Sequence, residues 1–128
     1  MEDRSRLRQE IGRLMAVQQV LVEGLLKAKP FRAGSVVRRF SVCGKAGCRC
    51  QRGEKHGPFW YLSEKEGGRT KLRYLGTEAK ARQELQAVEN YRQWRRLRQR
   101  FRRVQRETEA MLDRLGAVLA AAEEGGVL

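Results

Sequence analysis

The stretch CGKAGCRCQRGEKHGPFW, residues 43–60, contains all three cysteines of this 128-residue chain and its only histidine. Four residues scattered at random would all fall within 14 positions, the span from Cys43 to His56, roughly 0.4% of the time, so the clustering indicates a physical cause. The spacing is Cys-x4-Cys-x-Cys-x5-His. Glycines occupy the intervening turns, where a chain that folds tightly around an ion needs permissive backbone dihedrals: Gly44, Gly47 and Gly53.

Three thiolates and one imidazole form a closed tetrahedral donor set of the kind that holds structural zinc. We therefore predict one structural zinc ion per chain. The two thiols of the Cys-x-Cys pair can point the same way if that segment is extended. Such an ion would supply on the order of 10 kcal/mol of folding free energy. The predicted ligands are Cys43, Cys48, Cys50 and His56.

Two other interpretations of the cluster stay open. The cysteines could be small buried hydrophobes, with His56 capping the turn before Gly57 and Pro58. Alternatively, one thiol could be a nucleophile with His56 as its base, but that reading needs an orienting acid and a pocket, and the sequence offers neither among its lysines and arginines. We therefore expect no enzymatic activity.

The composition predicts a single cytoplasmic domain with a modest core. Apolar residues make up 41% of the chain, and an odd number of cysteines argues against a disulfide framework. Residues 1–10 are charged and no long apolar segment follows them, so we expect neither secretion nor a membrane span.

The hydrophobic pattern predicts an α+β fold with a small three-stranded antiparallel sheet between two long helices. An apolar residue recurs every three or four positions from residue 2 to about 28, with Gln18 as the one polar member. The runs VVRRFSV, FWYLS and RTKLRYL predict strands, the last two joined by a hairpin at residues 66–68. We assign residues 1–29 to the first helix, 30–76 to a metal-clamped β head and 77–124 to the second helix.

The second helix is predicted to begin after a Thr77 cap and to end at Gly125 and Gly126. From Trp94 to Ala122, residues on one side of it recur in unbroken steps of three and four, which is typical of a coiled coil. We expect the two helices to return antiparallel as a coiled-coil stalk. Because the second helix is much longer, Met111 and the residues beyond it are expected to pair with another copy, giving a homo-oligomer.

The middle of the chain resembles a known group of proteins. The shared order is G-S-x-x-x-R-x-x-x-C-G-K-x-x-C-x-C, a short spacer, H-G-P-[FY], an aromatic strand, a glycine hairpin and a helix with N-Y-R, matched between Gly34 and Arg92. It resembles a family of small uncharacterised bacterial proteins that are often encoded near transposases or other mobile elements. This chain departs from the pattern at Ala46, in place of proline, and at Phe59-Trp60, in place of two tyrosines. The resemblance implies a mobile-element context and no particular activity.

The net charge of +13 suggests a polyanionic partner. Residues 31–76 carry +8 and residues 77–106 carry +7, whereas residues 107–128 carry −4. Eight arginines lie between Arg92 and Arg106, and five of these have no Asp or Glu three or four positions away. Those five are Arg95, Arg96, Arg98, Arg100 and Arg102.

We therefore predict a non-catalytic protein that binds DNA or RNA through phosphates. The aromatic residues Phe59, Trp60 and Tyr61 could stack on bases, although we expect core packing at two of the three. The alternative is a coiled-coil adaptor that recruits a transposase or another nucleic-acid enzyme. The residues predicted to contact nucleic acid are Arg92, Arg95, Arg96, Arg98, Arg100, Arg102 and Arg103 of the helix, with Arg38, Arg39, Arg49, Lys71 and Arg73 of the head.

Overall fold

The computed structural model describes residues 3–125 and contains two helices and one three-stranded antiparallel sheet, an α+β fold. The chain divides into two compact units, one formed by the chain up to Ala28 together with the part from Trp94 onward, the other by Lys29–Gln93. In order, the elements are α1 (Arg4–Leu26), β1 (Ser35–Ser41), the 3₁₀ helix η1 (Arg49–Arg52), β2 (His56–Glu66), β3 (Arg69–Tyr74) and α2 (Glu78–Gly125).

The helix boundaries follow from local capping. The Asp3 side chain accepts a hydrogen bond from the Ser5 backbone N–H, which satisfies one of the free donors at the start of α1. Thr77 caps α2 in the same way, because its Oγ1 accepts from the Lys80 N–H at 3.3 Å, so the predicted cap is confirmed. The predicted end at Gly126 lies outside the described residues.

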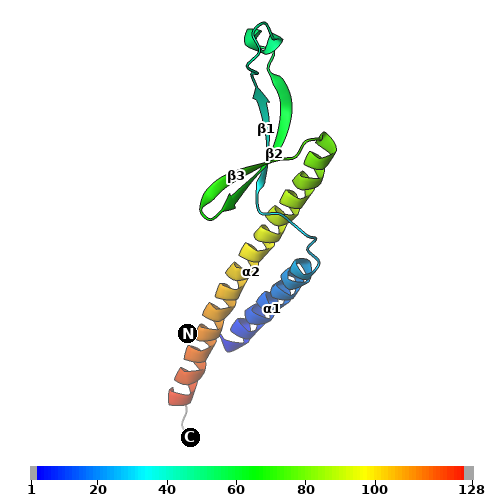
Figure 1. The fold of residues 1–128 in the computed structure, drawn as a ribbon. Helices are drawn as coiled ribbons and strands as arrows, with labels where there is room; N and C mark the ends of the chain where they lie inside the picture. Colours follow the sequence, from blue (N-terminus) through cyan, green and yellow to red (C-terminus); the bar gives the residue numbers. More distant parts are fainter. Residues whose placement is uncertain (1–2, 126–128) are drawn as a thin grey trace. The chain divides into compact units, whose positions relative to one another are not determined.

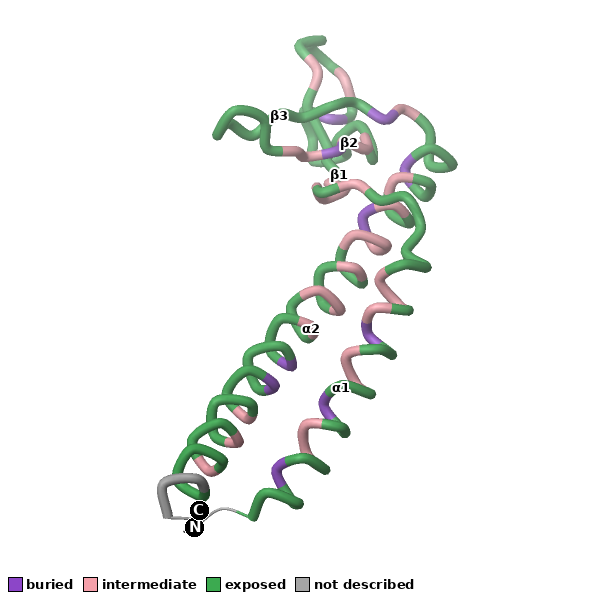
Figure 2. The backbone as a smooth tube through the Cα atoms, turned by 90° about the horizontal axis from the view of Figure 1, so that it is seen from below, coloured by how far each residue is buried: buried purple, intermediate pink, exposed green. Residues whose placement is uncertain are grey.

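In the first unit, α1 packs antiparallel along the second half of α2 (Figure 1). Gly24 lies beside Leu97 near one end of the pair, and Gln18 lies beside Thr108 further along. The buried residues of α1 recur every seven positions and lie along one side of the helix (Figure 2): Leu7, Leu14 and Leu21.

One premise of the sequence analysis is wrong here. Met111 was expected to lie beyond the reach of α1, yet it packs against the buried cluster of Leu14, Leu21 and Val104. The reason is that α1 pairs with α2 from Leu97 onward. The length of α2 therefore gives no argument that Met111 needs a second copy.

In the second unit, the strands have the order β1-β2-β3. β2 is longer than the run FWYLS suggested, because it pairs with β1 from His56 and with β3 out to Glu66, where Gly67 and Gly68 make the hairpin turn. Gly67 and Gly68 have φ of 60° and 80°, a region that glycine adopts without steric cost.

One face of this sheet packs against the first turns of α2. The core consists of Leu62, Leu75, Ala81 and Val88, with Val36 and Trp60 packed against it. Leu85 of α2 is 43% exposed, whereas Ala81 is buried in this core. Among the helices of residues 3–125, none has the length and apolarity required to cross a membrane.

Candidate functional site

The four predicted ligands meet at the end of the sheet where β1 leads into β2. Cys43 follows β1, Cys48 precedes η1, Cys50 lies within η1 and His56 begins β2. Their ligand atoms all lie within 4.8 Å of one another. The Cys-x-Cys segment is not extended throughout, because Cys48 has extended dihedrals while Cys50 lies in the 3₁₀ turn. This turn buries Cys50, which keeps only 3% of its surface exposed.

Local hydrogen bonds hold the loop in this conformation. The Cys43 N–H donates to Cys50 Sγ at 3.3 Å, and the Gln51 side-chain amide donates to the Cys43 carbonyl at 2.8 Å. Gly47 and Gly53 have φ of 82° and 104°, as expected for the turns between ligands, whereas Gly44 does not have a positive φ. Gly53 ends η1, since its N–H reaches the carbonyls of that turn.

The distances fit a four-coordinate ion. Cys43 Sγ and Cys50 Sγ are 3.4 Å apart, and Cys48 Sγ and His56 Nε2 are 3.3 Å apart. Metal–sulfur bonds of about 2.3 Å and metal–nitrogen bonds of about 2.0 Å at tetrahedral angles place such atoms roughly 3.5–3.8 Å apart. A disulfide would need a separation of about 2.05 Å, and all three cysteines are free. The cluster is therefore able to hold a metal ion with four protein ligands.

The thiols of Cys43 and Cys50, 3.4 Å apart, have pKa values shifted in opposite directions. The Lys45 backbone N–H donates to the Cys43 thiol and, with His56 and the other two cysteines, lowers the pKa of Cys43 to about 6. Burial raises the pKa of the Cys50 thiol. At neutral pH Cys43 is therefore a thiolate, the form that binds a metal ion.

The arginines of α2 between Arg92 and Arg106 differ in their surroundings. Arg98 is half-buried and its guanidinium carbon lies 5.9 Å from the centre of the Phe101 ring, while Arg92 approaches Glu89 at 3.9 Å. Arg100 and Arg103 line a hollow beside α1. We call the following exposed residues the arginine stripe: Arg95, Arg96, Arg102, Arg103 and Arg106.

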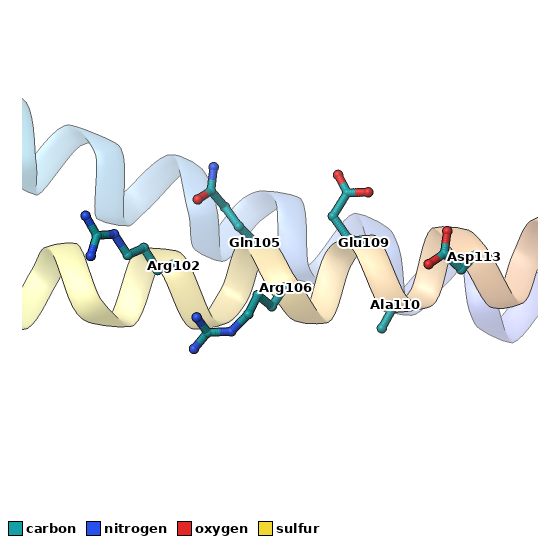
Figure 3. A pocket seen from close by; sticks show the side chains of 6 residues that line it. All are labelled: Arg102, Gln105, Arg106, Glu109, Ala110 and Asp113. Carbon is teal, nitrogen blue, oxygen red and sulfur yellow. The ribbon is translucent and has the colours of Figure 1, made fainter.

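The arginine stripe has few acidic partners. Within the described residues 3–125, no ion pair is found for Arg95, Arg102, Arg103 or Arg106. The charge changes sign further along the helix, where Arg102 and Arg106 are followed by Glu109 and Asp113 around an open hollow on α2 (Figure 3). The positive surface thus ends within α2.

The predicted basic residues of the head do not form one surface. Arg39 shares a face of the sheet with Phe59, whereas Lys71 and Arg73 lie on the other face, across from Glu64 and Leu62. Lys71 pairs with Glu66 at 3.3 Å and Arg73 with Glu84 at 3.6 Å. Of the remaining two, Arg38 lies over the Phe40 ring and Arg49 is exposed on η1.

Comparison with known protein families assigns the chain to one of them. A family model described as a domain of unknown function (DUF6788) matches residues 2–87. The chain belongs to this family. The DUF6788 match includes α1, the sheet and all four cluster residues, whereas the arginine stripe lies outside it. Comparison with curated proteins gave no match, and comparison with solved structures gave none either.

Proposed function

We propose that this protein binds DNA or RNA without catalysing a reaction, and that the arginine stripe contacts the phosphates. The observation that carries this proposal is the exposure of Arg95, Arg102 and Arg106 with no ion pair in the described part of the chain. Like charges this close on one helix repel one another, and a phosphate backbone would remove that repulsion.

The dimensions of the stripe suit a nucleic-acid strand. Arg95 and Arg106 are eleven residues apart, which corresponds to about 16 Å along a helix. A strand of duplex DNA presents a phosphate about every 3.4 Å along the axis, so the stripe spans about five of them. Arginine is suited to this role because its planar guanidinium can hold two phosphate oxygens at once.

We also propose that the metal ion is zinc and that its role is structural. Three thiolates and an imidazole are the donors that zinc prefers, and four protein ligands leave no open position for water or substrate. The loop of residues 43–56 has only one buried apolar side chain, Cys50, so a metal would supply stability that packing does not. The seven-residue spacing of buried residues in α1 likewise supports a coiled-coil stalk.

A charge-matched pair of variants tests phosphate binding. The triple variant Arg95→Gln, Arg102→Gln and Arg106→Gln removes three charges from the stripe, and glutamine keeps the helical propensity. The control variant Arg4→Gln, Arg6→Gln and Arg8→Gln removes the same charge from exposed positions on α1. We expect the stripe variant to lose more than tenfold in affinity for duplex DNA at about 0.1 M salt, and the control to lose much less.

Equal losses in the two triple variants would show that only net charge matters and would contradict the proposed contact. No binding of the unmodified protein to DNA or RNA would favour the adaptor alternative. In that role the stripe would face an acidic surface of a transposase or a similar enzyme. Cytoplasmic localisation, homo-oligomer formation and a mobile-element context remain predictions from the sequence.

A further inference from the structure

The face of the sheet that is turned away from α2 carries an aromatic and aliphatic surface. Strand alternation and register place Val37 of β1, Phe59 and Tyr61 of β2, and Leu72 and Tyr74 of β3 on this side. None of these five residues is buried, and Tyr74 and Leu72 are 58% and 37% exposed. We call them the outer face.

The two tyrosines of the outer face form a pair. Tyr61 and Tyr74 are direct cross-strand partners, with ring centroids 5.5 Å apart and planes tilted by 54°. Phe59 continues the row along β2, two residues before Tyr61 and on the same side. The rings are therefore held on a paired strand, where each can present part of its surface without loop rearrangement.

The opposite face already has a partner. Leu62 and Trp60 alternate with the outer-face residues and pack with Val88 and Ala81 of α2. Leu62 is completely buried there. The sheet therefore needs no second layer to bury its core, and the rings of the outer face are left for another role.

Charge on the outer face favours a polyanion. Its positions include Arg39, directly across from Phe59, and Lys65, and they include no acidic residue. The acidic residues of the three strands, Glu64 and Glu66, lie on the opposite face across from Lys71 and Arg69. The absence of acidic residues from the outer face would not strengthen the binding of an apolar protein partner. It would strengthen the binding of a phosphate backbone that lies next to the rings.

We propose that the outer face is a stacking platform for the bases of single-stranded nucleic acid, with Tyr74 and Tyr61 as the stacking residues and Arg39 near a phosphate. This inference rests on the proposed nucleic-acid binding and adds the substrate class. Bases in a duplex are stacked on one another and expose only their edges. Flat rings on a sheet can therefore stack only on bases that are unstacked, as in a single strand.

Substitutions at Tyr74 separate stacking from simple apolar contact. Binding is measured with a fluorescein-labelled oligothymidine and with a duplex of mixed sequence at one salt concentration. Tyr74→Leu keeps apolar area but has no aromatic ring, and Tyr74→Phe keeps the ring. We expect Tyr74→Leu to weaken single-strand binding by about 5- to 150-fold, the range for losing one stacked base, and to leave duplex binding unchanged. Tyr74→Phe should bind like the unmodified protein.

The control is Leu85→Ala, which removes an exposed apolar side chain from α2 in the same unit and should change neither affinity. Equal single-strand binding by the Leu and Phe variants would overturn the platform while leaving the proposed function standing. Binding of neither nucleic acid by the unmodified protein would overturn both. Sedimentation of the free proteins adds one further outcome: self-association that Tyr74→Leu abolishes would assign the outer face to contact between copies and contradict the platform.

Discussion

Gln18 of α1 donates a 2.6 Å hydrogen bond from Nε2 to Oγ1 of Thr108 of α2, ninety positions away in the chain. Thr108 is only 5% exposed, and its hydroxyl in turn donates to the Val104 carbonyl at 2.8 Å. Both residues lie among the apolar positions along which the helices pack. A polar pair of this kind favours one alignment of the helices, because any slip would leave its groups without partners.

The hydrogen bond predicts that substitutions of Gln18 and Thr108 have non-additive effects on the free energy of unfolding in a double-mutant cycle. Thr108→Val keeps the side-chain shape but leaves the half-buried Gln18 amide without its acceptor, which should lower the free energy of unfolding by about 1–3 kcal/mol. Gln18→Leu together with Thr108→Val should restore most of that loss. Urea unfolding measures both, with exposed Gln19→Ala as a control expected within about 0.5 kcal/mol of the unmodified protein. A double variant as unstable as the sum of its parts would show that the pair is not coupled.

The Glu84 carboxylate predicts a stability effect in the sheet unit. Its side chain is 13% exposed and lies between two arginines, with Arg32 Nε at 2.8 Å and Arg73 Nη2 at 3.6 Å. The Arg32 N–H does not point at the carboxylate well enough to form a hydrogen bond, so the contact is an ion pair. Both arginines remain 39% and 49% exposed, which limits the gain through solvent screening.

Glu84→Gln should therefore lower the unfolding free energy by about 1–2 kcal/mol, less than for a fully buried pair. Glu78→Gln is the matched control, because Glu78 pairs with Arg82 at 3.0 Å with both side chains mostly exposed, and this pair should contribute less than about 0.5 kcal/mol. Thermal unfolding followed by near-ultraviolet circular dichroism reports on this unit when Trp94 is changed to Phe in every protein compared, because Trp60 then gives the tryptophan signal. Equal midpoints for the two variants would count against the role of Glu84.

The lowered pKa of Cys43 predicts how zinc affinity depends on pH. Zinc requires thiolates, so binding releases a proton from each thiol that is still protonated, and the affinity falls as pH falls. Cys43, with a pKa of about 6, is already a thiolate above that pH and must lose a proton only below it. Cys50, whose pKa is raised by burial, releases its proton throughout the neutral range.

We therefore expect a plot of log apparent affinity against pH to be steeper below about pH 6 than above it, by about one power of ten per pH unit from Cys43. Competition with a chromophoric chelator between about pH 5 and pH 8 measures this slope in a His56→Ala background, where no imidazole proton contributes. A slope that stays constant through pH 6 would mean that Cys43 is protonated like an ordinary thiol before the metal binds.

Local patterns in the sequence predict much of this fold. The helix positions of Leu7, Leu14 and Leu21, the Thr77 cap and the glycine hairpin depend on neighbours within a few residues, and all are found as expected. The grouping of the four possible metal ligands was also predictable, because they share one loop. The 3₁₀ turn at Cys50 was not, since it depends on hydrogen bonds to Cys43 across that loop.

Pairings over long distances account for the remaining errors. The contact of Met111 depends on where α1 begins its pairing with α2, which no local spacing specifies. The ion pairs of Glu84 bring together residues from three segments, and the division of the basic head residues between two faces requires the strand register. The place of Tyr74 on the outer face was missed for the same reason, because only the pairing with Tyr61 puts both rings on one face.

The central claim is that phosphates bind at the arginine stripe, and the salt dependence of DNA affinity tests it most directly. With about five phosphates neutralised, a plot of log affinity against log salt should have a slope near −4 to −5 on duplex DNA, because each neutralised phosphate contributes about −0.9. The variant Arg95→Gln, Arg102→Gln and Arg106→Gln should make that slope shallower by about three, and the control with Arg4, Arg6 and Arg8 changed to glutamine should leave it near its original value. The same slope in all three proteins would contradict the account.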